Sequence, residues 1–295
     1  MSNVTRQIPL FVHNIFTVRA PLTFPILVAV FVSYNFGYSA EPGVEPQKKP
    51  VLSIKDETEA FGGRRINLGI DGHAAFIILP KILSGAVPMQ WVWYAPTFQG
   101  SLPSPRHSFI IQRVLKAGMA FAGVDAGESY GNAGGTALYT AFHDALTEHF
   151  QLSPKAVLLP QSRGGLMLYN WAAMHAEQVE RIAGIYTVCD LQSYPGLKTA
   201  AAAYHLSEAQ MAVELPRHNP IDLLAPLVMA KVPILHIHGD SDKLVPMEKN
   251  SAELARRYRA LGGSMELLVV PGKGHEEADE FFTSERFVVF LTTGK

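Results

Sequence analysis

One segment combines a strand-like run, a serine and two glycines in an order that can build a nucleophile. Residues 157–159 are apolar, Ser162 follows among turn-forming residues, and Gly164 and Gly165 precede a helix-like segment, 166–174. A strand, a sharp turn with serine at its tip and a helix expose the hydroxyl and aim the free N–H groups of the helix toward it. Ser162 is therefore predicted to be a nucleophile, the alternative being an ordinary strand-to-helix connection.

Two later strand ends carry the residue types that activate a serine. The apolar run 234–237 leads to Asp240 and Asp242, and the run 266–270 leads through a glycine-rich loop to His275. Serine, aspartate and histidine thus follow one another at the C-terminal ends of predicted strands, where open α/β sheets form their sites. A histidine titrates near neutrality and can take the serine proton, while an aspartate holds the histidine tautomer. The pattern predicts acyl transfer through a serine.

The oxyanion formed in acyl transfer needs two hydrogen-bond donors. One is predicted to be the backbone N–H of Arg163, directly after the nucleophile. The second is expected from the N–H of Thr97 or Phe98, after the strand-like run 91–95, because Pro96 has no N–H. The Arg163 side chain can assist the oxyanion, bind a substrate carboxylate, or pack under neighbouring loops.

A short segment, 127–131, follows another predicted strand, 120–124, and reaches the same edge of the sheet. Glu128 and Tyr130 within it are candidate substrate contacts. The alternative is a glycine-bounded turn held by local hydrogen bonds.

A competing interpretation concerns His236, His238 and Asp240, which form a His-x-His-x-Asp pattern similar to a zinc motif of metallo-β-lactamases. That motif needs a histidine directly after the aspartate, and Ser241 stands there. Alternation along the strand instead favours core or hydrogen-bonding roles for both histidines. We expect no metal and no cofactor.

Strand-like and helix-like runs alternate from about residue 66 onward, which predicts a mostly parallel α/β sheet with helices on both faces. Residues 41–65 are rich in Pro, Glu and Lys and are predicted to be a linker or irregular lead-in. Residues 191–230 interrupt the rhythm with two short helices and are predicted to be a small helical cap that shapes the substrate pocket, the alternative being a packed helical excursion without substrate contact. The predicted strands are 74–79, 91–95, 120–124, 157–159, 182–188, 234–237 and 267–270, and the predicted helices are 109–117, 136–150, 166–175, 248–261 and 277–291.

The first 40 residues differ from the rest. Arg6 and Arg19 are their only charges, residues 22–32 are largely apolar, and small residues precede Glu41. This pattern predicts a secretory signal cleaved near Ala40, and hence an exported protein. The alternative is a membrane anchor, but the apolar run is shorter than the ~20 residues that span a bilayer, so no stable span is expected after cleavage.

The charge balance excludes some partners. The whole chain has 25 basic and 26 acidic residues, and removal of the two leader arginines leaves 23 against 26, or about −3. Such a chain has no strong basic field, so nucleic acid is not an expected partner. Cys189 is the only cysteine, so no internal disulfide forms, and it is predicted to be a small buried hydrophobe.

Three motifs resemble those of the α/β-hydrolase superfamily, and the resemblance covers residues 66–292. They are the segments 161–165 (Gln-Ser-Arg-Gly-Gly), 238–246 (His-Gly-Asp-Ser-Asp-Lys-Leu-Val-Pro) and 272–275 (Gly-Lys-Gly-His). Pro160 stands where the usual Gly-x-Ser-x-Gly begins. The resemblance implies a Ser-His-Asp triad whose acid falls on Asp242, with Asp240 second and Asp190 third.

Within the superfamily the chain looks most like esterases and prolyl-oligopeptidase-type hydrolases, and the Ser-Arg pair resembles that of glucuronoyl esterases. We therefore expect an exported serine hydrolase that cleaves a small or carbohydrate-linked ester through an acyl-enzyme. The alternatives are a serine peptidase of prolyl-oligopeptidase type and an inactive binding protein with the hydrolase fold.

Overall fold

The computed structural model describes residues 49–82, 85, 88–98 and 100–295, all of which belong to the unit formed by residues 48–295. The predicted signal, 1–40, and the start of the predicted lead-in, 41–48, lie outside the described residues. None of the helices in the described part of the chain has the length and apolar character needed to cross a membrane.

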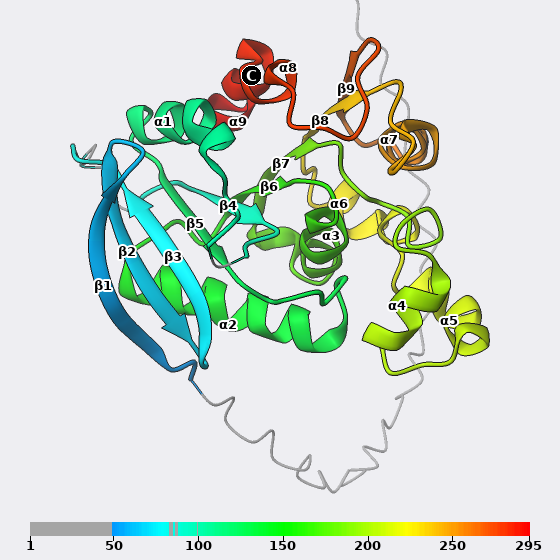
Figure 1. Cartoon of the computed structure of the whole chain (residues 1–295), viewed down its shortest axis with the longest axis horizontal. Coiled ribbons are helices and arrows are strands. Elements are labelled where there is room, and N and C mark those ends of the chain that lie inside the picture. The colour runs from blue at the N-terminus through cyan, green and yellow to red at the C-terminus, as the bar shows by residue number, and fades with distance from the viewer. Residues whose placement is uncertain (1–48, 83–84, 86–87, 99) are drawn as a thin grey trace, which may run out of the picture. The chain divides into compact units, whose positions relative to one another are not determined.

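The described residues form a nine-stranded sheet in the order β1-β2-β3-β5-β4-β6-β7-β8-β9 (Figure 1). The strands β1 to β3 form an antiparallel meander and β3 pairs antiparallel with β5, whereas the strands from β4 to β9 are parallel. The predicted mostly parallel α/β sheet is confirmed. The strands are β1 (Leu52–Ala60), β2 (Gly63–Ile70), β3 (His73–Leu79), β4 (Trp91–Ala95), β5 (Ala120–Val124), β6 (Ala156–Pro160), β7 (Val179–Ile185), β8 (Ile234–Gly239) and β9 (Met265–Val270).

Helices cover both faces because successive side chains of a buried strand point to opposite sides. Trp91 and Trp93 of β4 belong to one buried cluster with side chains of α2, α3, α6 and α7, and Val92 and Tyr94 belong to a second cluster with side chains of α1, α8 and α9. These helices are α1 (Ser108–Lys116), α2 (Ala133–His149), α3 (Gly164–Met174), α6 (Ala225–Met229), α7 (Ser251–Ala260), α8 (Asp279–Phe282) and α9 (Glu285–Thr293).

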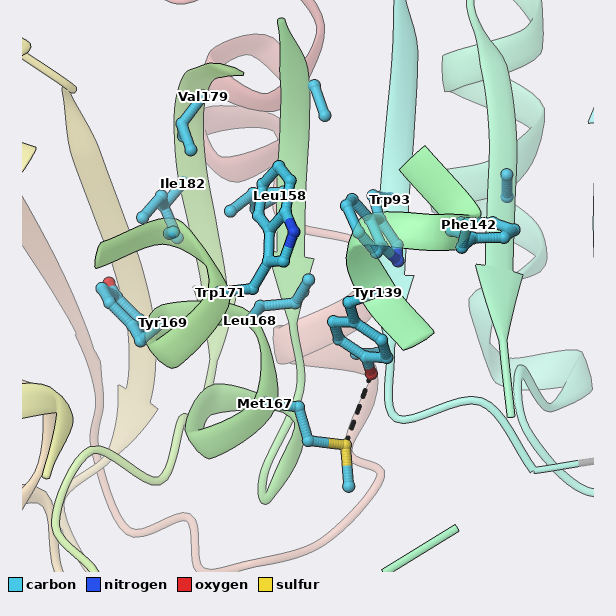
Figure 2. Packing of buried hydrophobic residues seen from close by; sticks show 14 of the residues in the cluster. Trp93, Tyr139, Phe142, Leu158, Met167, Leu168, Tyr169, Trp171, Val179 and Ile182 are labelled. Carbon is cyan, nitrogen blue, oxygen red and sulfur yellow. Dashed lines mark hydrogen bonds between the residues drawn. The ribbon is translucent and has the colours of Figure 1, made fainter. Parts of the chain in front are cut away.

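The helix that follows Ser162 is anchored by large side chains (Figure 2). The rings of Trp93 and Trp171 meet edge to face with centroids 4.7 Å apart, and the Tyr139 hydroxyl donates to the Met167 sulfur at 3.4 Å. Both Trp171 and Met167 belong to α3, so this packing fixes the helix against the sheet. A rigid α3 in turn fixes the turn from which it starts.

In the described part of the segment predicted to be a linker, 41–65, the prediction is wrong. From residue 52 onward it forms β1 and the start of β2. The strand β1 lies at the edge of the sheet and exposes most of its side chains, so its Lys, Asp and Glu residues hide the strand periodicity. Charged side chains on an edge strand also discourage pairing with another chain.

The predicted insertion contains two short helices, α4 (Leu197–Ala203) and α5 (Glu208–Glu214), as expected. Ser207 caps α5 in a capping box with Gln210. The insertion packs in one apolar cluster with Tyr130, Leu166 and Val188, beside the helix α3.

Candidate active site

Ser162 lies in a strained turn between β6 and α3. Its φ is +49°, in the left-handed region that non-glycine residues rarely adopt. The turn is held by two backbone hydrogen bonds: Ser162 N–H donates to the Ile185 carbonyl at 3.0 Å, and the Ser162 carbonyl accepts from Val188 N–H at 2.9 Å. The nucleophile elbow predicted from the sequence is therefore present, with Pro160 ending β6 in place of the usual glycine.

The two glycines after Ser162 allow the turn to sit between neighbouring strand ends. A Cβ at Gly164 would lie 2.1 Å from the Ala95 carbonyl oxygen, and one at Gly165 would lie 2.1 Å from the Val188 oxygen. Any side chain at either position would push the turn away from the end of β4 or from the segment after β7.

Ser162, His275 and Asp242 form a connected triad. The Ser162 Oγ lies 2.9 Å from His275 Nε2, and His275 Nδ1 lies 2.8 Å from Asp242 Oδ2. Because a carboxylate only accepts, the His275 proton lies on Nδ1 and Nε2 is free to accept the serine proton. The orientation is that of a general base poised beside its nucleophile.

Asp242 is held ionised by its surroundings. Burial acts to raise the pKa of this carboxyl, but hydrogen bonds from His238, His275 and the Val245 N–H outweigh it and keep the pKa well below its usual range. The carboxylate is therefore ionised at neutral pH and can stabilise a positive imidazolium.

The two other candidate acids accept hydrogen bonds from backbone N–H groups instead. The exposed Asp240 accepts from Gly272 N–H at 2.7 Å, and Asp190 accepts from Gln192 N–H at 3.0 Å. Of the three aspartates, Asp242 is the one that contacts His275.

The candidate oxyanion donors divide into two groups. The Phe98 N–H donates to the Leu102 carbonyl at 3.2 Å, so it is not free and its predicted role is wrong. Among the described residues, the backbone N–H groups of Arg163 and Thr97 have no hydrogen-bond partner. These two N–H groups remain the predicted oxyanion donors.

The Arg163 side chain is engaged by protein groups. Its guanidinium pairs with Glu128 at 2.7 Å and lies over the Phe98 ring, 5.1 Å from the centroid. Glu128, predicted to contact substrate, thus holds Arg163. Tyr130 is buried against the helical insertion, and neither residue lines the pocket beside the nucleophile.

A small pocket of about 190 Å³ opens beside Ser162 and His275. Two exposed acids, Glu276 and Glu277, line it, and neither forms an ion pair within the described part of the chain. The insertion 191–230 contributes no lining residue, so its predicted role in shaping this pocket is not supported. The lining consists of Pro96, Leu102, Gln161, Ser162, Arg163, Tyr186, His275, Glu276 and Glu277.

Tyr186 is a pocket residue that the sequence did not reveal. Its ring meets that of His275 at 4.6 Å, and its hydroxyl accepts from Gln161 Nε2 at 2.6 Å. The Gln161 carbonyl oxygen accepts from Tyr94 and from His107, each at 2.7 Å. The Tyr186 hydroxyl proton is not used in this contact with Gln161, and Tyr186 is one of the residues that line the pocket.

The two histidines of the pattern that resembles a zinc motif are engaged in hydrogen bonds within the protein. The four ring nitrogens of His236 and His238 all contact protein oxygen atoms. The described residues contain no group of three or more His, Cys, Asp or Glu side chains that could hold a metal ion.

Solved structures share this fold at low sequence identity. An S-formylglutathione hydrolase from Agrobacterium tumefaciens matches with a TM-score of 0.62 at 14% identity, over 82% of this chain and 96% of its own. A truncated carbohydrate esterase from gut microbiota matches with 0.57 at 16%, over 84% and 96%. Dipeptidyl peptidase 4 from Porphyromonas gingivalis matches with 0.60 at 15%, over 82% of this chain but only 35% of its own.

A sequence search among curated proteins finds no match. A family match, in contrast, spans residues 135–288, which is just over half of the chain and includes Ser162, Asp242 and His275. With the α/β-hydrolase fold and the connected triad, this match shows that the chain is a serine hydrolase belonging to the prolyl oligopeptidase family.

Proposed function

We propose that the protein is an esterase that cleaves short acyl esters through an acyl-enzyme on Ser162. The observation that carries this proposal is the connected triad beside a pocket of about 190 Å³. That volume is below the ~300 Å³ at which ligand pockets usually begin. It suits a short acyl group.

The reaction follows from the geometry. Ser162 Oγ attacks the ester carbonyl while its proton passes to His275 Nε2, and Asp242 stabilises the imidazolium. The N–H groups of Arg163 and Thr97 bind the oxyanion. His275 then gives its proton to the departing alcohol oxygen, leaving an ester on Ser162. Water attacks this acyl-enzyme with His275 again as base, which releases the acid and restores the serine.

The alcohol part of the substrate is proposed to be rich in hydroxyl groups. A second, polar pocket of about 470 Å³ shares Leu102 with the catalytic pocket. Its wall includes Arg65, Asn67 and Asp56, a mixture of donors and acceptors that suits sugar hydroxyls rather than a single charge. The fold similarity to a carbohydrate esterase is consistent with this choice.

A serine peptidase is the second candidate function. The family match favours it, and Glu276 and Glu277 at the pocket offer carboxylates to a substrate amine. The same acids disfavour anionic substrates, as does the pairing of Arg163 with Glu128. A role of Arg163 in binding a substrate carboxylate is therefore not part of the proposal.

Hydrolysis of p-nitrophenyl acetate, butyrate and octanoate, measured beside alanyl and prolyl p-nitroanilides, tests the proposal. We expect acetate and butyrate to have the highest kcat/KM, and an acetylated sugar to be deacetylated. Ser162→Ala is the control for background hydrolysis. Anilides hydrolysed as fast as the esters would replace this proposal with the peptidase.

We also propose export, which rests on the acid-free, apolar character of residues 1–40. Mass spectrometry of the protein from its native host should find a new N-terminus near Glu41. An intact Met1 on the cytoplasmic protein would contradict it.

A further inference from the structure

Two buried histidines that take no part in the proposed reaction lie directly behind the triad acid. His236 and His238 both belong to β8, and neither is exposed to solvent. Ser251, the first residue of α7, lies between them, with its Oγ 2.9 Å from His236 Nδ1 and 2.8 Å from His238 Nδ1. One serine hydroxyl thus bridges two imidazole rings.

Next to the triad, the oxygen atoms around His238 determine which of its ring nitrogens carries a proton. His238 Nε2 lies 2.9 Å from the Val245 carbonyl oxygen and 3.3 Å from Asp242 Oδ2. Both oxygen atoms only accept, so Nε2 of His238 carries a proton. In a neutral ring the other nitrogen, Nδ1, then accepts from the Ser251 hydroxyl.

The remaining protons follow from this assignment. Ser251 has one proton and gives it to His238, so its oxygen accepts from His236 Nδ1–H. The other nitrogen of His236 is then bare and accepts from the Tyr169 hydroxyl, 2.8 Å away. With both rings neutral, every hydrogen bond from Tyr169 to His238 points in one direction, toward Asp242, and the two rings are in different tautomers.

We propose that His238 is a positioning residue for the triad, held in its tautomer by Ser251, His236 and Tyr169. Asp242 has two oxygen atoms and about four acceptor sites. The N–H groups of Leu244 and Val245 donate to Oδ1 at 3.0 and 2.8 Å, and His275 and His238 approach Oδ2. The His238 N–H, which hydrogen-bonds the Val245 carbonyl oxygen at 2.9 Å, also lies 3.3 Å from Oδ2, and this contact opposes rotation of the carboxylate away from His275.

The surrounding elements leave room for these hydrogen-bonded side chains. A Cβ at Gly184 of β7 would lie 2.5 Å from the His236 ring, so a glycine is needed where the ring passes. The groups that face the two rings are Tyr169 from α3, Ser251 from α7 and Asp242. Buried networks of this kind are stable only when every member has its partner, and here each one does.

Nitrogen-15 NMR of the histidine side chains tests the proton assignment directly. It is best measured on the inactive Ser162→Ala protein at pH 7, so it does not depend on the substrate or on the proposed function. We expect His236 protonated on Nδ1 only and His238 on Nε2 only. Two protons on His238, or the opposite tautomer of either ring, would overturn the proposal.

Three variants test the effect on catalysis, which rests on the proposed function. His238→Leu removes the donor and should lower kcat by about 10- to 100-fold, since the N–H contact with the charged Asp242 is lost. His238→Gln keeps an N–H at the Nε2 position and should restore most of kcat. Ser251→Ala leaves His238 in contact with Asp242 but frees its tautomer, so its loss should be smaller than that of His238→Leu.

A pH profile separates positioning from a general loss of structure. With one donor fewer, Asp242 becomes more basic and holds the imidazolium more strongly, so the acid limb of kcat/KM should move to higher pH in His238→Leu. Tyr186, Glu276 and Glu277, which also lie near His275, are unchanged in this variant. An unmoved acid limb, or a His238→Gln variant as impaired as His238→Leu, would show that His238 only fills space.

Discussion

The two sides of His275 differ in burial and in hydrogen bonding. On its inner side, Asp242, His238 and Ser251 are buried, and their polar atoms are all engaged. On its outer side, Arg163 is 31% exposed and pairs with the 45% exposed Glu128, while Glu276 and Glu277 face solvent. The inner side is buried and its polar atoms are all hydrogen-bonded or ion-paired, whereas the outer side is exposed to solvent.

Mutations on the two sides should therefore differ in their effects. Inside a protein a polar interaction is strong and an unpaired group is expensive, so the inner side should respond to the loss of single atoms. Exposed ion pairs are screened by water and salt and contribute little. We therefore expect substitutions on the inner side of His275 to have large effects and substitutions on the outer side to have small ones.

Substitution of two aspartates in the same loop should have very different effects on kcat. Asp242→Asn should lower kcat by about 10⁴-fold, because an amide favours the wrong histidine tautomer. The matched variant Asp240→Asn changes an exposed residue bonded to Gly272 N–H and should lower kcat less than about tenfold. Steady-state kinetics with a short-chain ester measures both, and the reverse order would move the triad acid to Asp240.

The inner side should also make stability depend on pH. Burial, with a smaller effect of His238, lowers the pKa of His236 to about 3 from an ordinary 6.5. Between these values the unfolded chain binds a proton that the folded protein excludes. The free energy of unfolding should therefore fall as the pH drops below 6.5, by up to about 1.4 kcal/mol per pH unit from this residue.

Urea unfolding at pH 7 and pH 5 checks this expectation in the parent protein and in His236→Asn. Asparagine keeps a donor toward Ser251 but cannot take up a proton, so the variant should lose less stability on acidification. Equal losses in both proteins would mean that His236 is not kept neutral by the fold.

At the boundary of the two sides, Tyr186→Phe should lower kcat/KM by about tenfold, the loss expected for one hydrogen bond to the substrate. Tyr94→Phe is the control, because this hydroxyl also bonds Gln161 but does not line the pocket. Equal losses in the two variants would assign the effect to the Gln161 network instead.

The smallest effect is expected on the outer side. Arg163→Ala keeps the backbone donor and removes an exposed pair worth about 1 kcal/mol or less, so kcat on neutral esters should change only a few-fold. A double-mutant cycle with Glu128→Gln measures the pair. If kcat instead falls by about 100-fold or more, the guanidinium stabilises the oxyanion.

This contrast also explains what the sequence could predict. Ser162, Asp242 and His275 each follow an apolar strand, so the strand periodicity and the topology together bring them to one edge. The strand β1 escapes prediction because an exposed edge strand has no apolar alternation to detect. The engaged Phe98 N–H and the Arg163–Glu128 pair depend on loop conformation, and the Tyr186 contact joins segments 89 residues apart that only the folded chain brings together.

Covalent labelling of the nucleophile tests whether Ser162 forms the acyl-enzyme. A fluorophosphonate probe should label the parent protein at Ser162, the labelled peptide should be identifiable by mass spectrometry, and Asp242→Asn should react far more slowly. Ser162→Ala should not be labelled. Equal labelling of Ser162→Ala, or a labelled peptide that lacks Ser162, would contradict the assignment of the catalytic centre.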